Sequence, residues 1–87
     1  MIRWNLILSG RVQHVGLRFR AKMTAQQYGL TGWVRNLDDG NVELEVQGEQ
    51  QNIYRFLNTL GNLPGIQFTI IYSEKLEPKT EKRFGVR

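Results

Sequence analysis

A β-hairpin in the middle of the chain constrains the fold most. Residues 32–37 place Trp33 and Val34 at positions typical of a strand, and residues 38–41 include an Asp-Gly pair, which suits a tight turn because it tolerates positive φ. In residues 42–47, Val, Leu and Val then alternate with two Glu and one Gln. Alternation with period two buries one face of a strand and leaves the other in water. The pattern predicts an antiparallel pair with one solvated face.

The segments on either side of the hairpin show strand alternation or helical spacing of their apolar residues. Before the hairpin they predict a strand over 2–9 and a helix over 18–27 that stops at Gly29. After the hairpin they predict a helix with apolar residues at 53, 56, 57 and 60 that stops at Gly61, and then a strand over 66–72. An exposed connection over 74–83 leads to a short strand with Phe84 and Val86 on one side. This order predicts an α+β, ferredoxin-like split βαβ (βαββαβ) sandwich. Such a sandwich has a mostly antiparallel sheet with two helices on one face, here with a short C-terminal strand.

The first predicted helix leaves one question open. Its apolar stripe consists of Leu17, Ala21, Ala25 and Tyr28, and Phe19 and Met23 lie off it, as the sequence shows. Either the helix is packed on two sides or these two side chains are partly exposed.

The absence of cysteine limits the chemistry of the chain. Its 87 residues contain no Cys and one His, which excludes disulfides, a thiolate metal site and a site of several histidines. Net charge is +4, from 12 basic and 8 acidic residues, and favours anionic ligands without separating metabolites from nucleic acids. The apolar stretches are short and interrupted by charge. We therefore expect one cytoplasmic domain over 1–87 with no metal, membrane span or signal peptide.

Residues 10–18, Gly-Arg-Val-Gln-His-Val-Gly-Leu-Arg, lie between the first predicted strand and the first predicted helix. Glycines let backbone N–H groups approach a ligand closely, and the N-terminal end of the helix attracts anions. Arg18, at the helix start, offers a planar guanidinium to phosphate oxygens. If the stretch curls over the helix end, its N–H groups and Arg18 converge on one phosphoryl group. We interpret it as a phosphate-binding loop whose ligand-binding residues are Gln13, His14, Val15, Gly16, Leu17 and Arg18.

Arg18 and Asn36 each have an ordinary structural interpretation as well. An arginine that opens a helix is most often solvated, and an asparagine before a hairpin turn most often flanks or caps that turn. In a split βαβ sheet, however, the strand that ends near Asn36 borders the central strands, so Asn36 can approach the loop that follows the first strand. Its amide both donates and accepts, and can hold a water molecule in line with a bound phosphorus.

His14, the only histidine, lies within this loop. It is either an exposed side chain without a role or a group whose protonated form strengthens anion binding at acidic pH. We favour the first, because the attack of a positioned water on phosphorus needs no titrating group. We expect the other basic side chains, Arg3 among them, on solvated faces. We expect Trp4, Trp33 and Phe68 in the core rather than stacked on nucleobases.

Two motifs, in this order and spacing, resemble those of the acylphosphatases. The first is the stretch 10–18, and the second is Leu-Thr-Gly-Trp-Val-Arg-Asn at 30–36, followed by Asp39-Gly40. The resemblance covers nearly the whole chain, because it extends to residues 42–48, 55–57 and 84–87.

The resemblance implies a ferredoxin-like fold and hydrolysis of carboxyl phosphates to a carboxylate and inorganic phosphate, without cofactor or metal. It places the family's substrate-binding arginine on Arg18, its water-orienting asparagine on Asn36 and its phosphate-binding amides on 14–18. Two positions depart from the family: His14 replaces a glycine and Leu17 replaces a phenylalanine. Leucine keeps an apolar anchor of smaller area, whereas a β-carbon at residue 14 costs about 1 kcal/mol or more if the backbone there takes a conformation that favours glycine.

Two alternatives to an enzyme stay open. One is an anion- or ligand-binding domain of the same fold, in which the change at His14 has weakened catalysis. The other is a nucleic-acid binder, which would need exposed aromatic and basic residues on the central strands, where the chain instead has Glu43 and Glu45 on the solvated face. We expect a monomer that binds a small acyl phosphate or inorganic phosphate, and no nucleic acid or membrane.

Overall fold

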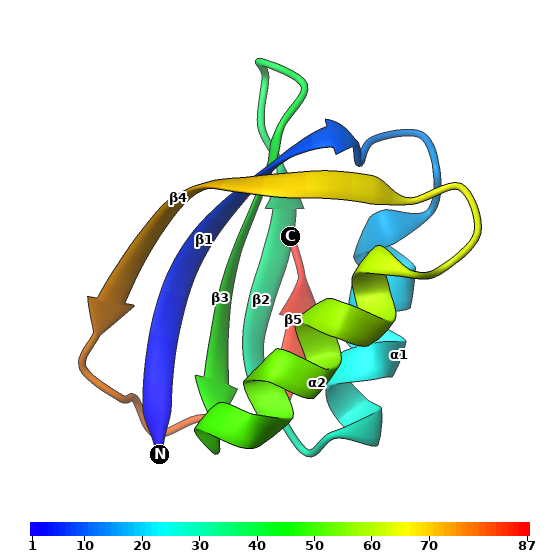
Figure 1. Ribbon diagram of the computed structural model, residues 1–87. Helices are drawn as coiled ribbons and strands as arrows, with labels where there is room; N and C mark the ends of the chain where they lie inside the picture. The colour runs from blue at the N-terminus through cyan, green and yellow to red at the C-terminus, as the bar shows by residue number, and fades with distance from the viewer.

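The computed structural model describes residues 1–87 as a five-stranded sheet with two helices packed on one face (Figure 1). Its elements are β1 (Ile2–Arg11), α1 (Leu17–Gln27), β2 (Thr31–Asn36), β3 (Val42–Gly48), α2 (Gln50–Gly61), β4 (Gln67–Leu76) and β5 (Phe84–Val86). The strand order is β4-β1-β3-β2-β5, and every pair is antiparallel except β2 with β5. The predicted α+β, ferredoxin-like class is confirmed. Neither helix has the length and apolar character needed to cross a membrane.

One apolar core fills the space between the sheet and the helices. It is a single cluster of 16 buried residues to which every element except β4 contributes. In α1 only one side faces this core, since Leu17, Ala21 and Ala25 are buried while Phe19 and Met23 are 66% and 50% exposed. The open question about α1 is therefore answered: the helix is packed on one side.

The first strand is longer than predicted, and the loop after it is shorter. β1 continues to Arg11, which pairs with Gln67 of β4, so Gly10 and Arg11 belong to the sheet. Gly10 has a φ of +126°, and a β-carbon there would lie 2.6 Å from the carbonyl oxygen of Gln67. The lack of a β-carbon at residue 10 thus allows β4 to lie close to β1, and it does not serve the approach of a ligand. The β1–α1 loop comprises residues 12–16.

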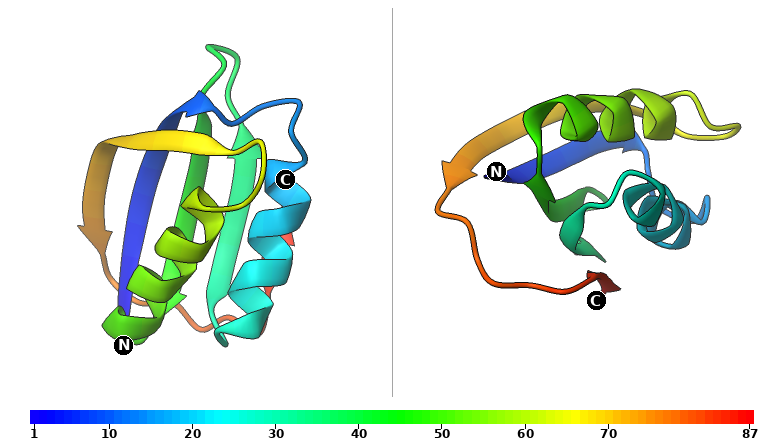
Figure 2. Two further views of the ribbon diagram at one scale, coloured as in Figure 1. Left: turned by 45° about the vertical axis from the view of Figure 1, so that its right-hand side comes forward. Right: turned by 90° about the horizontal axis from the view of Figure 1, so that it is seen from below.

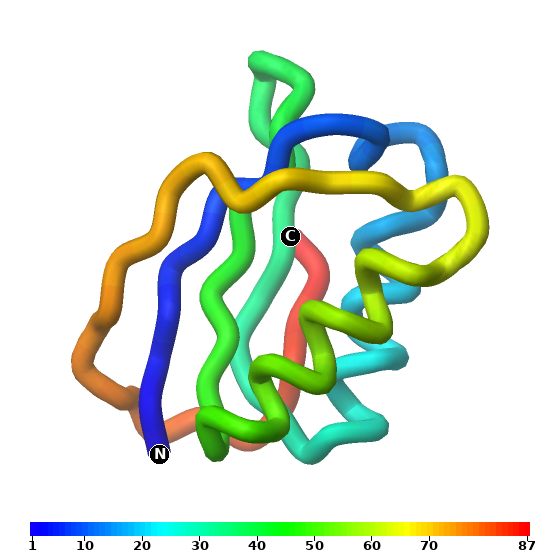
Figure 3. Tube along the Cα trace, viewed as in Figure 1, coloured from blue at the N-terminus to red at the C-terminus, as the bar shows by residue number.

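β4 differs from its predicted pattern because it contains a β-bulge. Ile7 of β1 pairs with Tyr72, and Leu8 pairs with Ile70, so Ile71 has no partner on β1. Adjacent residues of β1 point to opposite faces, and therefore the bulge places Ile70 and Tyr72 on opposite faces of the sheet. The predicted single alternation over 66–72 is wrong at Tyr72, and the strand changes direction along its length (Figure 3).

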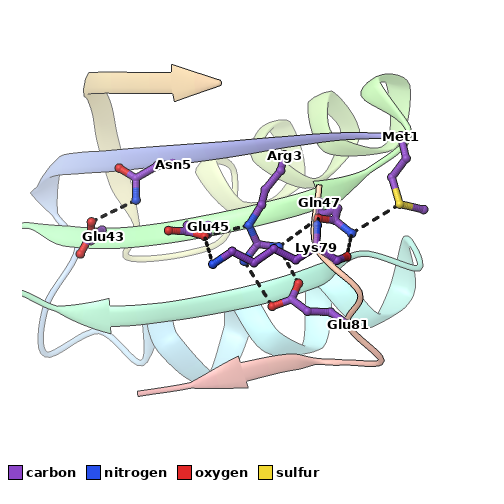
Figure 4. Close-up of polar contacts among 8 residues, drawn as sticks. All are labelled: Met1, Arg3, Asn5, Glu43, Glu45, Gln47, Lys79 and Glu81. Carbon is purple, nitrogen blue, oxygen red and sulfur yellow. Dashed lines mark hydrogen bonds and ion pairs between the residues drawn. The ribbon is translucent and has the colours of Figure 1, made fainter. Parts of the chain in front are cut away.

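The face of the sheet opposite the helices carries a polar network, drawn in Figure 4. Arg3 is fully buried, and its guanidinium donates to Glu45 at 2.8 Å and to Glu81 at 2.6 Å. The Gln47 side chain donates to the carbonyl of Lys79 at 2.7 Å and accepts from its N–H at 2.8 Å. The connection between β4 and β5 is thereby attached to the sheet. The expectation of a solvated Arg3 was wrong. The expected connection over 74–83 is mostly exposed, but its first three residues belong to β4.

Candidate active site

A surface pocket of about 530 Å³ lies where the β1–α1 loop meets the first turn of α1. Its lining includes five of the predicted site residues, His14, Gly16, Leu17, Arg18 and Asn36. The rest of the lining consists of Val12, Phe19, Lys22 and Val86. The end of β2 thus lies beside the start of α1, as the strand order of the predicted fold requires.

The backbone of the loop leaves several donors free beside this pocket. The N–H groups of residues 14–18 donate to no backbone carbonyl. Gly16, in the left-handed conformation at φ 71°, precedes α1 without a side-chain cap, and the first turn of the helix contains no acidic residue. An uncapped helix N-terminus has free N–H groups and a partial positive charge. This end of α1 is suited to bind an anion.

His14 occupies the loop with a φ of 63°, the only positive φ at a residue other than glycine. The left-handed conformation costs an L-residue about 1–2 kcal/mol. The loop therefore turns here in a conformation that favours glycine, although the residue has a β-carbon. The exposed His14 side chain lines the pocket.

Arg18 lies in the first turn of α1, with its side chain exposed. Its one side-chain hydrogen bond runs from Nη1 to the carbonyl oxygen of Arg87 at 3.2 Å, and it forms no ion pair. This contact agrees with Figure 2, in which the end of the chain lies beside the start of α1. A guanidinium has five N–H donors, so most of those of Arg18 are available to a ligand.

Asn36 is the last residue of β2, and its side chain is exposed without a hydrogen bond to the protein. The adjoining turn is instead stabilised by Asp39, whose carboxylate accepts from the backbone N–H of Asn41 at 3.0 Å and from its side-chain amide at 3.2 Å. Asp39, and not Asn36, therefore caps the turn. The amide of Asn36 is free to contact a molecule in the pocket.

Two predicted residues of the loop do not line the pocket. Val15 is half-buried against the core. The Gln13 amide donates at 2.8 Å to the carbonyls of both Leu37 and Asn41, so it joins the loop to the β2–β3 turn. No local pattern in the sequence indicates this contact, because it joins residues more than twenty positions apart.

Four pocket residues were missed by the sequence analysis: Val12, Phe19, Lys22 and Val86. The signal for Lys22 was available, since it follows Arg18 by four residues and such residues share a helix face. The sequence left open whether Phe19 is packed or partly exposed and placed Val86 on one side of a short strand, and it linked neither residue to the site. No group of three His, Cys, Asp or Glu side chains gathers anywhere in an arrangement that could hold a metal ion.

The fold and the pocket define a small ferredoxin-like protein with a pocket at an uncapped helix N-terminus. The family model "Acylphosphatase" matches residues 4–86. The acylphosphatase of Clostridium perfringens is 46% identical to this chain over 87 residues, which cover 98% of each chain. The acylphosphatase of Bacillus pumilus is 50% identical to it over 60 residues, which cover 69% of this chain and 67% of the relative. The solved structure of an acylphosphatase from Coxiella burnetii, 31% identical, superposes with a TM-score of 0.87 and covers 99% of this chain and 92% of its own. The chain belongs to the acylphosphatase family.

Proposed function

We propose that this pocket hydrolyses the carboxyl-phosphate bond of acyl phosphates, with Arg18 binding the phosphoryl group and Asn36 orienting the attacking water. Membership of the family supports the reaction itself, since acylphosphatases are hydrolases that act on acid anhydrides. One observation supports the two roles. The guanidinium of Arg18 and the amide of Asn36, both available to a ligand, line the same pocket beside the free N–H groups of residues 14–18.

The mechanism uses position and charge rather than a side-chain base. Arg18 and the loop N–H groups bind the phosphoryl oxygens and stabilise the negative charge that develops on them. Asn36 places a water opposite the acyl group, and the water oxygen bonds to phosphorus as the bond from phosphorus to the acyl oxygen breaks. The carboxylate is a good leaving group and takes up the proton that the water loses. The products are a carboxylic acid and inorganic phosphate.

Hydrolysis of benzoyl phosphate without added metal tests this proposal. Arg18→Ala should nearly abolish turnover because it removes phosphate binding, whereas Asn36→Ala should lower kcat more than it weakens the binding of inorganic phosphate. Comparable weakening of phosphate binding by both substitutions would contradict the two roles. If the unmodified protein shows no turnover above the Arg18→Ala control, the chain is instead an anion-binding domain of this fold.

We further propose that residues 1–87 act as a single-domain monomer on a small-molecule substrate. Support for one domain comes from the single core that joins the elements. Light scattering in solution tests the monomer, and a dimer mass at assay concentrations would overturn it. The cytoplasmic location stays a prediction from the sequence.

A further inference from the structure

The pocket has a second cation, Lys22, that the proposed reaction does not use. Lys22 lines it together with Arg18, and no acidic residue does. The Lys22 side chain is half-buried and takes part in no ion pair or hydrogen bond with the protein. A cation held at a pocket wall without a carboxylate partner is available to an anionic ligand.

The position of Lys22 on α1 sets how far this charge lies from the phosphoryl site. It follows Arg18 by four residues on the same face, which is a rise of about 6 Å along the helix, away from the loop. Side chains on a helix lean toward its N-terminus, so the Lys22 side chain leans back toward the first turn. An acyl group that extends from a phosphoryl group bound at the loop can therefore present its far end to Lys22.

Two apolar side chains also line the pocket without belonging to the core. Phe19 is 66% exposed and Val86 is 46% exposed. They can provide apolar contact for the methylene groups of an acyl chain whose two charged ends face the two cations. A neutral acyl group would use the apolar contact and leave Lys22 without a partner.

We infer that Lys22 is a specificity-determining residue that favours acyl phosphates whose acyl group ends in a second anionic group, such as the monoacyl phosphate of a dicarboxylic acid. This inference rests on the proposed function. The second charge lies several bonds from the reacting phosphorus, so its attraction to Lys22 is the same before and during the reaction. This attraction should therefore lower KM and leave kcat unchanged.

The test compares succinyl phosphate with butyryl phosphate, which have acyl chains of equal length and differ in the terminal carboxylate. The unmodified protein should show a kcat/KM for succinyl phosphate about fivefold higher than for butyryl phosphate, with the difference in KM, and added salt should reduce this ratio. Lys22→Gln should bring the ratio close to one, and Lys22→Arg should restore it. A general loss of activity in Lys22→Gln affects both substrates equally, so it does not change the ratio of their kcat/KM values.

Lys75→Gln is the matched control, because it removes one lysine charge from β4, outside the pocket lining. It should leave the ratio unchanged. A ratio that Lys22→Gln does not alter, or an equal fall in Lys75→Gln, overturns the inference and leaves the proposed function intact. If neither substrate is hydrolysed above the Arg18→Ala background, the proposed function fails and this inference fails with it.

Discussion

At the scale of single residues, His14 lowers the stability of the loop but has no role in the proposed reaction. Its φ of 63° is unfavourable for a residue with a β-carbon, yet the loop that it occupies still lines one pocket with Arg18 and Asn36. The proposed mechanism requires free N–H groups in this loop and no imidazole. The structure thus gives His14 a backbone conformation that costs free energy, while the loop that contains it lines the pocket.

His14→Gly should raise the free energy of unfolding by up to about 1 kcal/mol, because glycine adopts the left-handed conformation without steric cost. The greater freedom of glycine in the unfolded chain offsets part of this gain. His14→Ala is the matched control, since it removes the imidazole and keeps the β-carbon. Urea unfolding should place His14→Gly above His14→Ala, and equal stabilities would show that the backbone at this position is not strained.

At the scale of elements, Gln13 joins the two segments that form the pocket. Its amide donates to the carbonyls of Leu37 and Asn41, and each of these carbonyls also accepts a backbone hydrogen bond, from Gly40 and Leu37 respectively. The loop beside Arg18 and the turn beside Asn36 are thereby held in one relative position. Such positioning matters for an in-line attack, which is sensitive to small displacements.

Replacing Gln13 with Glu should lower both stability and kcat. An ionised carboxylate has no donor and would face two carbonyl oxygens, so the lost bonds and the repulsion together cost about 1–3 kcal/mol. Gln13→Met fills similar space without charge, and its loss should be smaller because both carbonyls retain a backbone partner. Urea unfolding and the kcat for benzoyl phosphate measure the two effects. A Gln13→Glu variant as stable and active as the unmodified protein would show that the contact does not position the site.

The N-terminus of α1 predicts that phosphate stabilises the fold. Positive side chains near a helix N-terminus are unfavourable, and the first turn has Arg18 and no acidic residue. Bound phosphate would compensate this charge and accept from the free N–H groups. Phosphate at ten times its Kd should therefore stabilise the fold by about 1.4 kcal/mol, which raises Tm by roughly 6–11 °C for a domain of this size.

Thermal unfolding in phosphate and in sodium chloride of equal ionic strength separates this effect from screening. Arg18→Ala should lose most of the shift. Arg55→Ala, which removes an exposed arginine from α2, should keep it. A shift of equal size in both variants would place the bound phosphate elsewhere on this basic chain.

At the scale of the whole molecule, local periodicity predicted the elements but not how the distant ones meet. The hairpin and both helices follow from spacing within single segments, and the proximity of Asn36 to the loop follows from the strand order that the fold imposes. The end of β1 and the bulge at Ile71 depend on the pairing of β1 with β4, segments far apart in the chain. Alternation shows that Arg3 faces away from the core, but not that a later connection covers it.

On the face of the sheet opposite the helices, the charge of buried Arg3 is paired with carboxylates. Arg3 bonds to Glu45 and Glu81, and these bonds raise the pKa of Arg3 even though burial lowers it. The hydrogen bond from Arg3, against an opposing effect of burial, lowers the pKa of Glu81 below its ordinary value. Trp33, expected in the core, is buried near Glu45 on this same face, and the Arg87 guanidinium lies 4.3 Å from its ring centroid. One face of the sheet is therefore stabilised by apolar packing and the other by ion pairs.

This arrangement predicts a loss of stability in acid that Glu81 partly causes. A carboxyl whose pKa is lower in the folded state contributes its full stability above the unfolded pKa, about 4.3, and loses it as the pH falls through the lower folded pKa. Glu81→Gln should thus be less stable than the unmodified protein by about 2 kcal/mol near neutral pH. The difference should shrink as the pH falls from about 5 to about 2.

Urea unfolding across this pH range measures the difference, with Glu77→Gln as the control because Glu77 is an exposed carboxylate on the same connection that forms no ion pair. The lowered pKa of Glu43, which bonds to Asn5 and Arg35 against the effect of burial, leaves some sensitivity to acid in either variant. The informative quantity is therefore the gap between Glu81→Gln and the unmodified protein. A gap that stays constant from neutral to acidic pH would mean that Glu81 stabilises the connection through its shape and neutral hydrogen bonds, and not through its charge beside Arg3.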